Sequence, residues 1–386
     1  MLRFLLLNFF MQSITAIAAP YTQIIFRNKG YSNSLVGVIV AIGQIASVII
    51  PVLACMIADK TRRTKLLAML FAFMSMIMFI PSALSGSLVL TAVAFFLASG
   101  ALWSLSPMVD GYQTRMFGGN SAKYGKVRAI GTLGYIACLV FFALSDMLDE
   151  KSNTSILYCL VAIYSLFIIV TAFAPREPRP TNEELRERKQ FFSFKWFDRK
   201  FYLFMLVVGI SRIGEAVIEK LLSSYMTEEL HLGGYFTIFV ALGALSEVVM
   251  IAIGGNLLQK GKVKPYTLIM LSCVGLAVRL MIYWLFPNVA AFTFGQLLHS
   301  LTFGALHIGV AKFIAQNVKS EHYSLATSFY WAIATNLPEM FGVLAGGFVI
   351  DMLGYRGLFA LYTLSPIIAF ILGLAFKKTL ISEATP

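Results

Sequence analysis

Long apolar stretches alternate with short polar turns along nearly the whole chain. A helix of about 20 apolar residues is long enough to cross the hydrocarbon core of a bilayer. Stretches of this kind fall near residues 3–26, 33–57, 64–83, 87–112, 125–147, 154–175, 201–226, 235–258, 264–285, 289–315, 321–348 and 355–377. The pattern therefore predicts an all-α, polytopic membrane protein with twelve transmembrane helices.

One polar segment, residues 176–200, is much longer than the other turns. It begins Arg-Glu-Pro-Arg-Pro and is densely charged, which is typical of a linker. Its stretch Glu183–Lys189 favours a short interfacial helix. The linker divides the chain into an N-terminal six-helix bundle, residues 1–175, and a C-terminal six-helix bundle, residues 201–386.

Composition supports a membrane protein, because 58% of the residues are hydrophobic and only 13% are charged. Soluble domains carry about 25% charged residues. Lysine and arginine lie 24 to 4 in favour of the turns on the linker's side, both chain ends included. This bias predicts that the linker and both termini lie in the cytoplasm, and that the protein resides in the cytoplasmic (inner) membrane. The net charge of +12 then reflects topology, not binding to nucleic acid.

Motifs of enzyme chemistry are missing from the sequence. It contains no GxxxxGK[ST] loop, no HExxH and no GxSxG, and its histidines lack metal-ligand spacing. The four cysteines stand apart in apolar segments, as small core residues do. We therefore expect neither an enzyme nor a bound cofactor or metal.

Ionisable residues inside the expected spans are the best candidates for function, because burying a charge in a membrane is costly. They are Asp110, Arg212, Glu215, Glu219, Lys220, Glu247, Arg279, His299, His307 and Glu339. Arg212, Glu215 and Glu219 have i, i+3, i+7 spacing and should share one helix face. Gln296, His299 and His307 should line a broad face of the tenth span. These charges either line a shared wet cavity or neutralise one another as purely structural pairs.

The stretch Ser106–Tyr135 places Asp110 just inside the end of one apolar run and Arg128 just inside the start of the next. One interpretation is a functional pair held within the protein. The other is a pair of helix-end charges that reach the water interface. Spacing alone leaves both interpretations open.

Over its whole length the chain resembles the major facilitator superfamily. The shared features are twelve spans, a central linker and a basic turn between spans 2 and 3. That turn, Cys-Met-Ile-Ala-Asp-Lys-Thr-Arg-Arg over residues 55–63, is similar to the superfamily's G-x-x-x-D-[RK]-x-G-[RK] signature. Asp59, Lys60 and Arg63 match this gating motif, whereas Cys55 and Arg62 replace its two glycines. The resemblance implies two pseudo-symmetric six-helix halves that rock around a central site.

Within the superfamily, Tyr124–Tyr135 resembles the start of span 5 in the oligosaccharide–proton symporters typified by lactose permease, and equally in the 3-phenylpropionate permease group. In the symporters a late span 4 carboxylate, an early span 5 arginine and an aromatic ring hold the sugar. The resemblance implies substrate-binding roles for Asp110, Arg128, Tyr135, Glu247 and His299. It likewise implies proton-coupling roles for Glu215, Arg279 and His299, and the shared helix face adds Arg212 and Glu219 to this charge network.

Two departures affect the coupling step. Thr302 stands where lactose permease has its proton-carrying carboxylate, and Gln296 replaces a basic residue, as in the phenylpropionate-permease-like group. If coupling to protons survives, the proton must be carried elsewhere, since a membrane-buried carboxylate or histidine can titrate. We hypothesise that Glu215 or Glu247 carries it, and that His299 relays it or orients the substrate.

These observations predict proton-coupled uptake of a small organic solute by alternating access, with a sugar as the first candidate. An aromatic carboxylate, such as a phenylpropionate-like acid, and a nucleoside are the alternative solutes. A membrane sensor or scaffold on the same fold is the competing class, and its mark would be a cavity without polar residues. We expect a monomer in the lipid bilayer, with the solute and protons as its partners.

Overall fold

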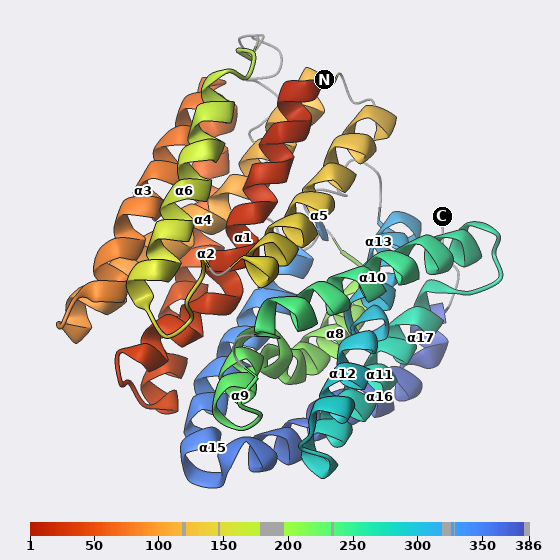
Figure 1. The fold of residues 1–386 in the computed structure, drawn as a ribbon. Helices are drawn as coiled ribbons and strands as arrows, with labels where there is room; N and C mark the ends of the chain where they lie inside the picture. Colours follow the sequence, from red (N-terminus) through yellow and green to blue (C-terminus); the bar gives the residue numbers. More distant parts are fainter. Residues whose placement is uncertain are drawn as a thin grey trace. The chain divides into compact units, whose positions relative to one another are not determined.

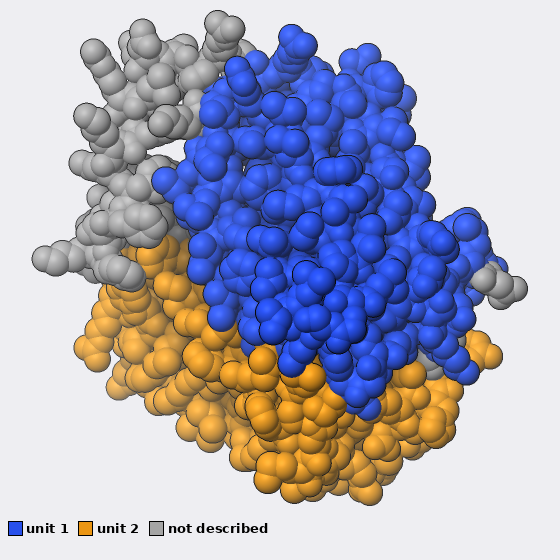
Figure 2. Space-filling model, turned by 90° about the vertical axis from the view of Figure 1, so that its left-hand side faces the viewer, with its two compact units in different colours: residues 1–31, 39–193 blue, residues 32–38, 194–386 orange. Residues whose placement is uncertain are grey.

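In the computed structural model the described residues are helical almost throughout and contain no strand (Figure 1). The structure describes residues 1–117, 121–145, 147–177, 197–232, 235–318, 326–327 and 329–381. They form two compact units: unit 1 contains residues 1–31 and 39–193, and unit 2 contains residues 32–38 and 194–386 (Figure 2). Of the expected linker, residues 178–196 lie outside the described residues, and so does the short helix expected at Glu183–Lys189.

Unit 1 is built on six long helices. They are α1 (Leu2–Asn28), most of α2 (Asn33–Thr61), α3 (Thr64–Leu84), α4 (Leu88–Met116), α5 (Ser121–Leu144) and α6 (Asn153–Ala172). Helix α1 packs on α5 and α6, and α3 packs on α4 and α6. The first and third helices are therefore the centres of packing in this unit.

Unit 2 repeats this order of packing with more interrupted helices. Its elements are α8 (Arg199–Ala216), η2 (Val217–Leu221), α9 (Leu222–Glu228), α10 (Phe236–Gln259), α11 (Pro265–Leu285), α12 (Val289–Leu297), η4 (Ser300–Ala305), α13 (Leu306–Asn317), η6 (Tyr330–Asn336), α15 (Leu337–Tyr362), α16 (Leu364–Ala375) and α17 (Lys377–Ile381). Helix α8, the first span of this unit, packs on α15 and α16, and α11, the third span, packs on α13 and α16. The two units therefore share one packing scheme.

Eleven helical segments of the described residues are long and apolar enough to cross a membrane. The last of them, Tyr330–Ala375, has 46 residues. At about 1.5 Å per residue it is more than twice as long as a bilayer core is thick. It is broken at Gly354, whose φ of 68° is a left-handed value that glycine adopts readily. This segment therefore accounts for the eleventh and twelfth expected spans, and the prediction of a twelve-span helical membrane fold is confirmed.

Glycines let helices approach closely within each unit. A Cβ atom on Gly134 of α5 would collide with the carbonyl oxygen of Phe9 on α1. In unit 2, a Cβ atom on Gly342 of α15 would lie 2.6 Å from the carbonyl oxygen of Ile213 on α8. Both neighbours are backbone atoms, which cannot turn aside as a side chain can. The glycine-rich run in α15 is therefore a packing surface, as expected for small residues in membrane helices.

The first turns of α2, residues 32–38, belong to unit 2 because they pack against α15. The Asp351 carboxylate accepts hydrogen bonds from the backbone N–H groups of Asn33 (3.1 Å) and Ser34 (2.7 Å) and from the Ser34 hydroxyl. These N–H groups are unpaired at any helix start, so a carboxylate there satisfies them and complements the helix dipole. Gly347 allows this approach, because a Cβ atom there would overlap the carbonyl oxygen of Asn33.

Candidate functional site

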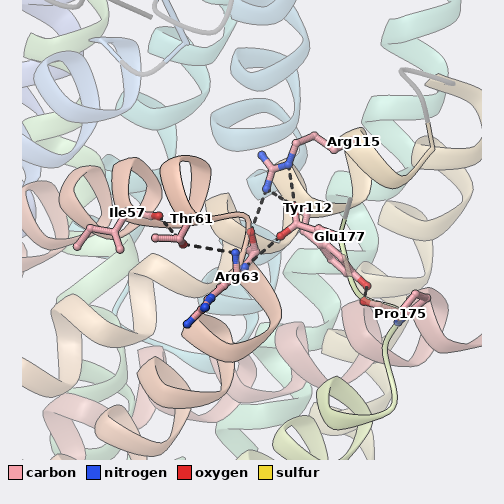
Figure 3. Close-up of polar contacts among 8 residues, drawn as sticks. Ile57, Thr61, Arg63, Tyr112, Arg115, Pro175 and Glu177 are labelled. Carbon is pink, nitrogen blue, oxygen red and sulfur yellow. Dashed lines mark hydrogen bonds and ion pairs between the residues drawn. The ribbon is translucent and has the colours of Figure 1, made fainter. Parts of the chain in front are cut away.

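The turn between α2 and α3 carries the expected gating motif. The side chains of Asp59 and Lys60 lie outside the described residues, and Arg63 is exposed. Thr61 orders the turn: its hydroxyl donates to the carbonyl oxygen of Ile57 (2.8 Å) and accepts from the backbone N–H of Arg63 (3.4 Å) (Figure 3). The gating role of the motif stays a prediction.

Glu177, at the start of the linker segment, lies at the centre of this region (Figure 3). Its side chain is only 1% exposed and pairs with Arg115 at the end of α4, with an N–O distance of 2.7 Å. The same carboxylate accepts from the backbone N–H of Thr64 at the start of α3 (3.0 Å). Nearby, the Tyr112 hydroxyl donates to the carbonyl oxygen of Pro175 (2.7 Å). Sequence reasoning missed Glu177 and Arg115, because charges in a polar loop usually face water.

The residues expected to hold substrate in unit 1 lie on α4 and α5, which contact each other. Asp110, Arg128 and Tyr135 are all half-buried. The Ser106 hydroxyl donates to Asp110 Oδ2 at 3.5 Å. One terminal nitrogen of Arg128, Nη1, is buried and makes no hydrogen bond within the described residues. A shared role of Asp110 and Arg128 stays a prediction.

Unit 2 contains a buried ion pair between its first and fifth spans. Arg212 on α8 donates through Nη2 to the Glu339 carboxylate on α15, and both side chains are 4% exposed. The Arg212 guanidinium also lies over the ring of Phe303, 5.8 Å from its centroid. Arg212 and Glu339 lie far apart in the sequence, which gave no means of pairing them.

Arg279 on α11 is fully buried, and its hydrogen-bond partners among the described residues are neutral side chains. It donates to Tyr283 Oη (3.2 Å), His299 Nδ1 (3.2 Å), Thr302 Oγ1 (3.4 Å) and Gln296 Oε1 (3.1 Å). Thr302 and Gln296, the two departures from the symporter pattern, are thus direct partners of this arginine. The guanidinium organises one face of the tenth span.

The contact with Arg279 decides the tautomer of His299. A guanidinium has only donors, so His299 Nδ1 must accept, and the ring proton must sit on Nε2. His299 Nε2 lies 3.8 Å from Glu247 Oε2 on α10. His299 therefore directs an N–H donor towards the Glu247 carboxylate. A second ring proton, on Nδ1, would require the bond from Arg279 to break.

Two further carboxylates, Glu215 and Glu219, lie close to His299. One potential ligand atom from each of the three residues falls within 4.8 Å of the others. Ligands on opposite sides of a cation with bonds of about 2.4 Å would be separated by a similar distance. However, Arg279 occupies His299 Nδ1, and Nε2 carries the proton, so neither ring nitrogen can bind a metal in this arrangement. The group therefore does not fit a histidine-ligated metal ion in this arrangement.

We name Glu215, Glu219, Glu247, Arg279 and His299 the unit 2 charge cluster. Two π-helical segments interrupt the helices that carry it: η2 follows Glu215 and contains Glu219, and η4 begins directly after His299. A third, η6, precedes Glu339. Such segments are rare and frequently mark functional sites. Each widens the helix locally and changes the direction of the side chains that follow. Helical spacing alone therefore could not place Glu219 relative to Glu215.

Aromatic rings continue the cluster along the tenth span. His299 stacks on Phe303 (centroid distance 5.4 Å), and Phe303 stacks on His307 (5.7 Å). Trp331 of η6 lies 6.0 Å from His307. The expected broad face with His299 and His307 thus exists, and Phe303 joins the two rings.

Comparison with known proteins shows the family. The model of the MFS_1 like family matches residues 1–361. The uncharacterized transporter YwbF of Bacillus subtilis (strain 168) is 21% identical over 347 residues, which cover 89% of this chain and 84% of that protein.

Solved structures share the fold at low identity. The nucleoside transporter NupG has a TM-score of 0.78 at 15% identity and covers 99% of both chains. A D-xylose-proton symporter has a TM-score of 0.72 at 12% identity, over 99% of this chain and 97% of its own. A POT family transporter, solved with a conjugated peptide, has a TM-score of 0.78 at 11% identity, over 98% and 96%. The chain belongs to the MFS_1 like family and is a multi-pass membrane transporter of the major facilitator superfamily.

Proposed function

We propose that this transporter takes up a small organic solute together with protons, and that a sugar is the first candidate solute. The observation that carries the proposal is the unit 2 charge cluster, in which three carboxylates surround one histidine beside a buried arginine. Carboxylates inside membrane helices commonly mark proton or ion pathways. Alternating access is the mechanism that the family resemblance implies.

Glu215 and Glu247 are the proposed proton carriers. Glu215 is 1% exposed, and its Oε1 makes no hydrogen bond within the described residues. Glu247 is half-buried and faces the Nε2–H group of His299. Either carboxylate can gain or lose a proton without breaking a hydrogen bond of Arg279. His299 cannot, so we assign it to orienting the carboxylates and the solute, not to relaying protons.

The family resemblance also supports solute-binding roles for three residues of unit 1. Asp110 would accept hydrogen bonds from hydroxyl groups, Arg128 would donate in bidentate fashion, and Tyr135 would stack on a ring face. The D-xylose-proton symporter and the nucleoside transporter among the structural neighbours both act on solutes that contain such hydroxyls. These likenesses support the fold directly and the solute class only by analogy.

We infer from the 24 to 4 distribution of basic residues that both chain ends and the linker lie in the cytoplasm. Single cysteines placed at Ser152 and Lys189, in a background without native cysteines, test this orientation. A membrane-impermeant maleimide added to intact cells should label position 152 and leave position 189 unlabelled. Labelling of position 189 from outside would contradict the orientation.

Transport by purified protein in proteoliposomes tests the proposed function. The solute is chosen from D-xylose, D-galactose, uridine and 3-phenylpropionate by its accumulation under an inward proton gradient. Glu215→Gln and Glu247→Gln are made separately, and at least one should lose uphill accumulation yet retain solute exchange. Asp110→Ala and Arg128→Ala should lose both activities, because removal of one partner from a desolvated charged contact costs roughly 2–5 kcal/mol, about 30-fold or more in affinity.

The outcomes separate the two parts of the proposal. If both glutamine variants still accumulate solute under the imposed gradient, neither residue carries the proton. If Asp110→Ala and Arg128→Ala exchange solute normally and only lose thermal stability, these charges are helix-end groups. Glu229→Gln, an exposed acid of unit 2, serves as the matched control and should retain both activities.

A further inference from the structure

Buried polar atoms in unit 2 lack hydrogen-bond partners beside the charge cluster. Glu215 Oε1 is an acceptor and Gln296 Nε2 is a donor; neither has a partner within the described residues, and the residues are 1% and 4% exposed. A buried polar atom that makes no hydrogen bond is costly, and native proteins keep few of them. We interpret these two atoms, which lie beside the charge cluster, as groups whose missing hydrogen bonds a bound solute supplies.

Arg279 determines which atoms the tenth span offers. Its Nη2 holds Gln296 Oε1, which leaves the amide nitrogen of Gln296 to donate elsewhere. Its Nη1 holds His299 Nδ1, which leaves Nε2–H as the donor of that ring. Gln296 and His299 are therefore held on one guanidinium as a pair of donors. The seventh span supplies the acceptors, Glu215 and Glu219.

The spacing of donor and acceptor suits a hydroxyl group. The potential ligand atoms of Glu215, Glu219 and His299 lie within 4.8 Å of one another. Because these atoms are at most 4.8 Å apart, an oxygen about 2.8 Å from two of them would subtend an angle of about 118° at most, a range that includes the roughly tetrahedral angle of a hydroxyl that donates one hydrogen bond and accepts another. A single hydroxyl can thus donate to one carboxylate and accept from His299.

We propose that Glu215, Glu219, Gln296 and His299 form a subsite for two neighbouring hydroxyl groups of the transported solute, the vicinal diol of a pyranose or of a ribose. Each carboxylate accepts a hydrogen bond from one hydroxyl, and Gln296 Nε2–H and His299 Nε2–H each donate a hydrogen bond to one hydroxyl oxygen. This inference rests on the proposed transport of a small organic solute and names its recognised group. A free carboxylate anion fits poorly, because it would face Glu215 and Glu219 without a proton to donate.

Arg279 is a positioning residue in this subsite. Its hydrogen bonds go to protein side chains and not to the solute, and two of them orient Gln296 and His299. Glu219, by contrast, accepts no hydrogen bond from the described residues and is half-buried, so it is the acceptor most open to a solute. Replacing Glu219 by glutamine preserves its size and one oxygen, which makes it the sharpest probe of the subsite.

Binding of matched solutes to the purified full-length protein tests the subsite. The probes are D-galactose with 2-deoxy-D-galactose, uridine with 2′-deoxyuridine, and 3-phenylpropionate, each titrated by calorimetry. In the unaltered protein, loss of one hydroxyl should weaken binding by about tenfold or more, as for a hydrogen bond to a charged group. We call this loss of affinity on removal of the hydroxyl the deoxy penalty. In Glu219→Gln the deoxy penalty should fall below about twofold, whereas Glu229→Gln should keep the full penalty. The two pairs distinguish a pyranose diol from a ribose diol.

A second pair of variants separates recognition from folding. His299→Gln keeps an N–H donor and should retain most of the deoxy penalty, whereas His299→Phe should lose it. An equal penalty in the unaltered protein and in Glu219→Gln would overturn the subsite, as would failure of both diol-containing solutes to bind. Proton-driven accumulation of 3-phenylpropionate would overturn the subsite but leave proton-coupled transport intact. Conversely, a protein that still discriminates between the diol and the deoxy solute but shows no proton-driven uptake would support the subsite and contradict proton coupling.

Discussion

Arg212→Met and Glu339→Leu, made separately, should each destabilise the transporter by about 3–5 kcal/mol, because each leaves a charge buried without its partner. Both side chains are 4% exposed, so the remaining charge cannot reach water without local unfolding. The double variant should recover most of this loss, since apolar side chains of similar volume can replace a buried ion pair at little cost. The measurement is thermal unfolding of the purified protein in detergent, followed by tryptophan fluorescence.

Lys378→Met provides the control, because Lys378 is exposed on α17 and should change the unfolding temperature little. If the two single variants and the double variant unfold at the same temperature as the unaltered protein, the pair contributes nothing to stability. Transport by the double variant adds a second readout. Retained transport would show a structural pair, and lost transport with full stability would place Arg212 in the coupling network.

Arg279→Met should abolish solute binding and lower the free energy of unfolding by about 2 kcal/mol or more, because hydrogen bonds from a charged donor are strong and four acceptors lose it together. The change also frees His299 to take either tautomer and removes a positive charge from beside Glu215. Arg279→Lys should restore part of the stability, since it keeps the charge. It should not restore binding, because an ammonium lacks the planar fork that reaches His299 and Gln296 together.

Calorimetric titration and thermal unfolding of the same preparations separate these effects. Arg356→Met is the matched control: Arg356 is an exposed arginine of unit 2 that donates to the carbonyl oxygen of Trp284. Full solute binding by Arg279→Met would contradict the organising role of the guanidinium. Full binding by Arg279→Lys alone would show that charge, and not geometry, is what the site requires.

The helical membrane fold could be predicted from the sequence because the bilayer imposes it directly. A spanning segment must be apolar for about 20 residues and must satisfy its own backbone hydrogen bonds. Its length and composition can therefore be recognised from one continuous stretch of sequence. Even the break at Gly354 belongs to this level, because Gly354 lies in the gap between the expected spans 321–348 and 355–377. The residues of the charge cluster were found in the same way, as ionisable groups in segments that should have none.

The partners of those residues could not be predicted, because they depend on contacts between distant segments. Nothing local in the sequence joins Arg212 to Glu339, or Arg115 to Glu177. The π-helical segments η2 and η4 shift side-chain directions, so regular helical spacing could not place Glu219 or Thr302.

The sequence by itself determined the class of this protein: its spans, its central linker and the set of ionisable side chains inside those spans, whose burial in a membrane is costly. Only the tertiary structure decided which groups each charge contacts. Arg279 binds neutral side chains, among them Thr302, which stands where the symporter pattern has a carboxylate. Its hydrogen bonds place the ring proton of His299 on Nε2 and leave the amide nitrogen of Gln296 available as a donor. Hydrophobicity acts over a continuous stretch of chain and can be summed along it, whereas a hydrogen bond depends on two atoms within about 3 Å and on their angle. That geometry exists only once the helices have packed.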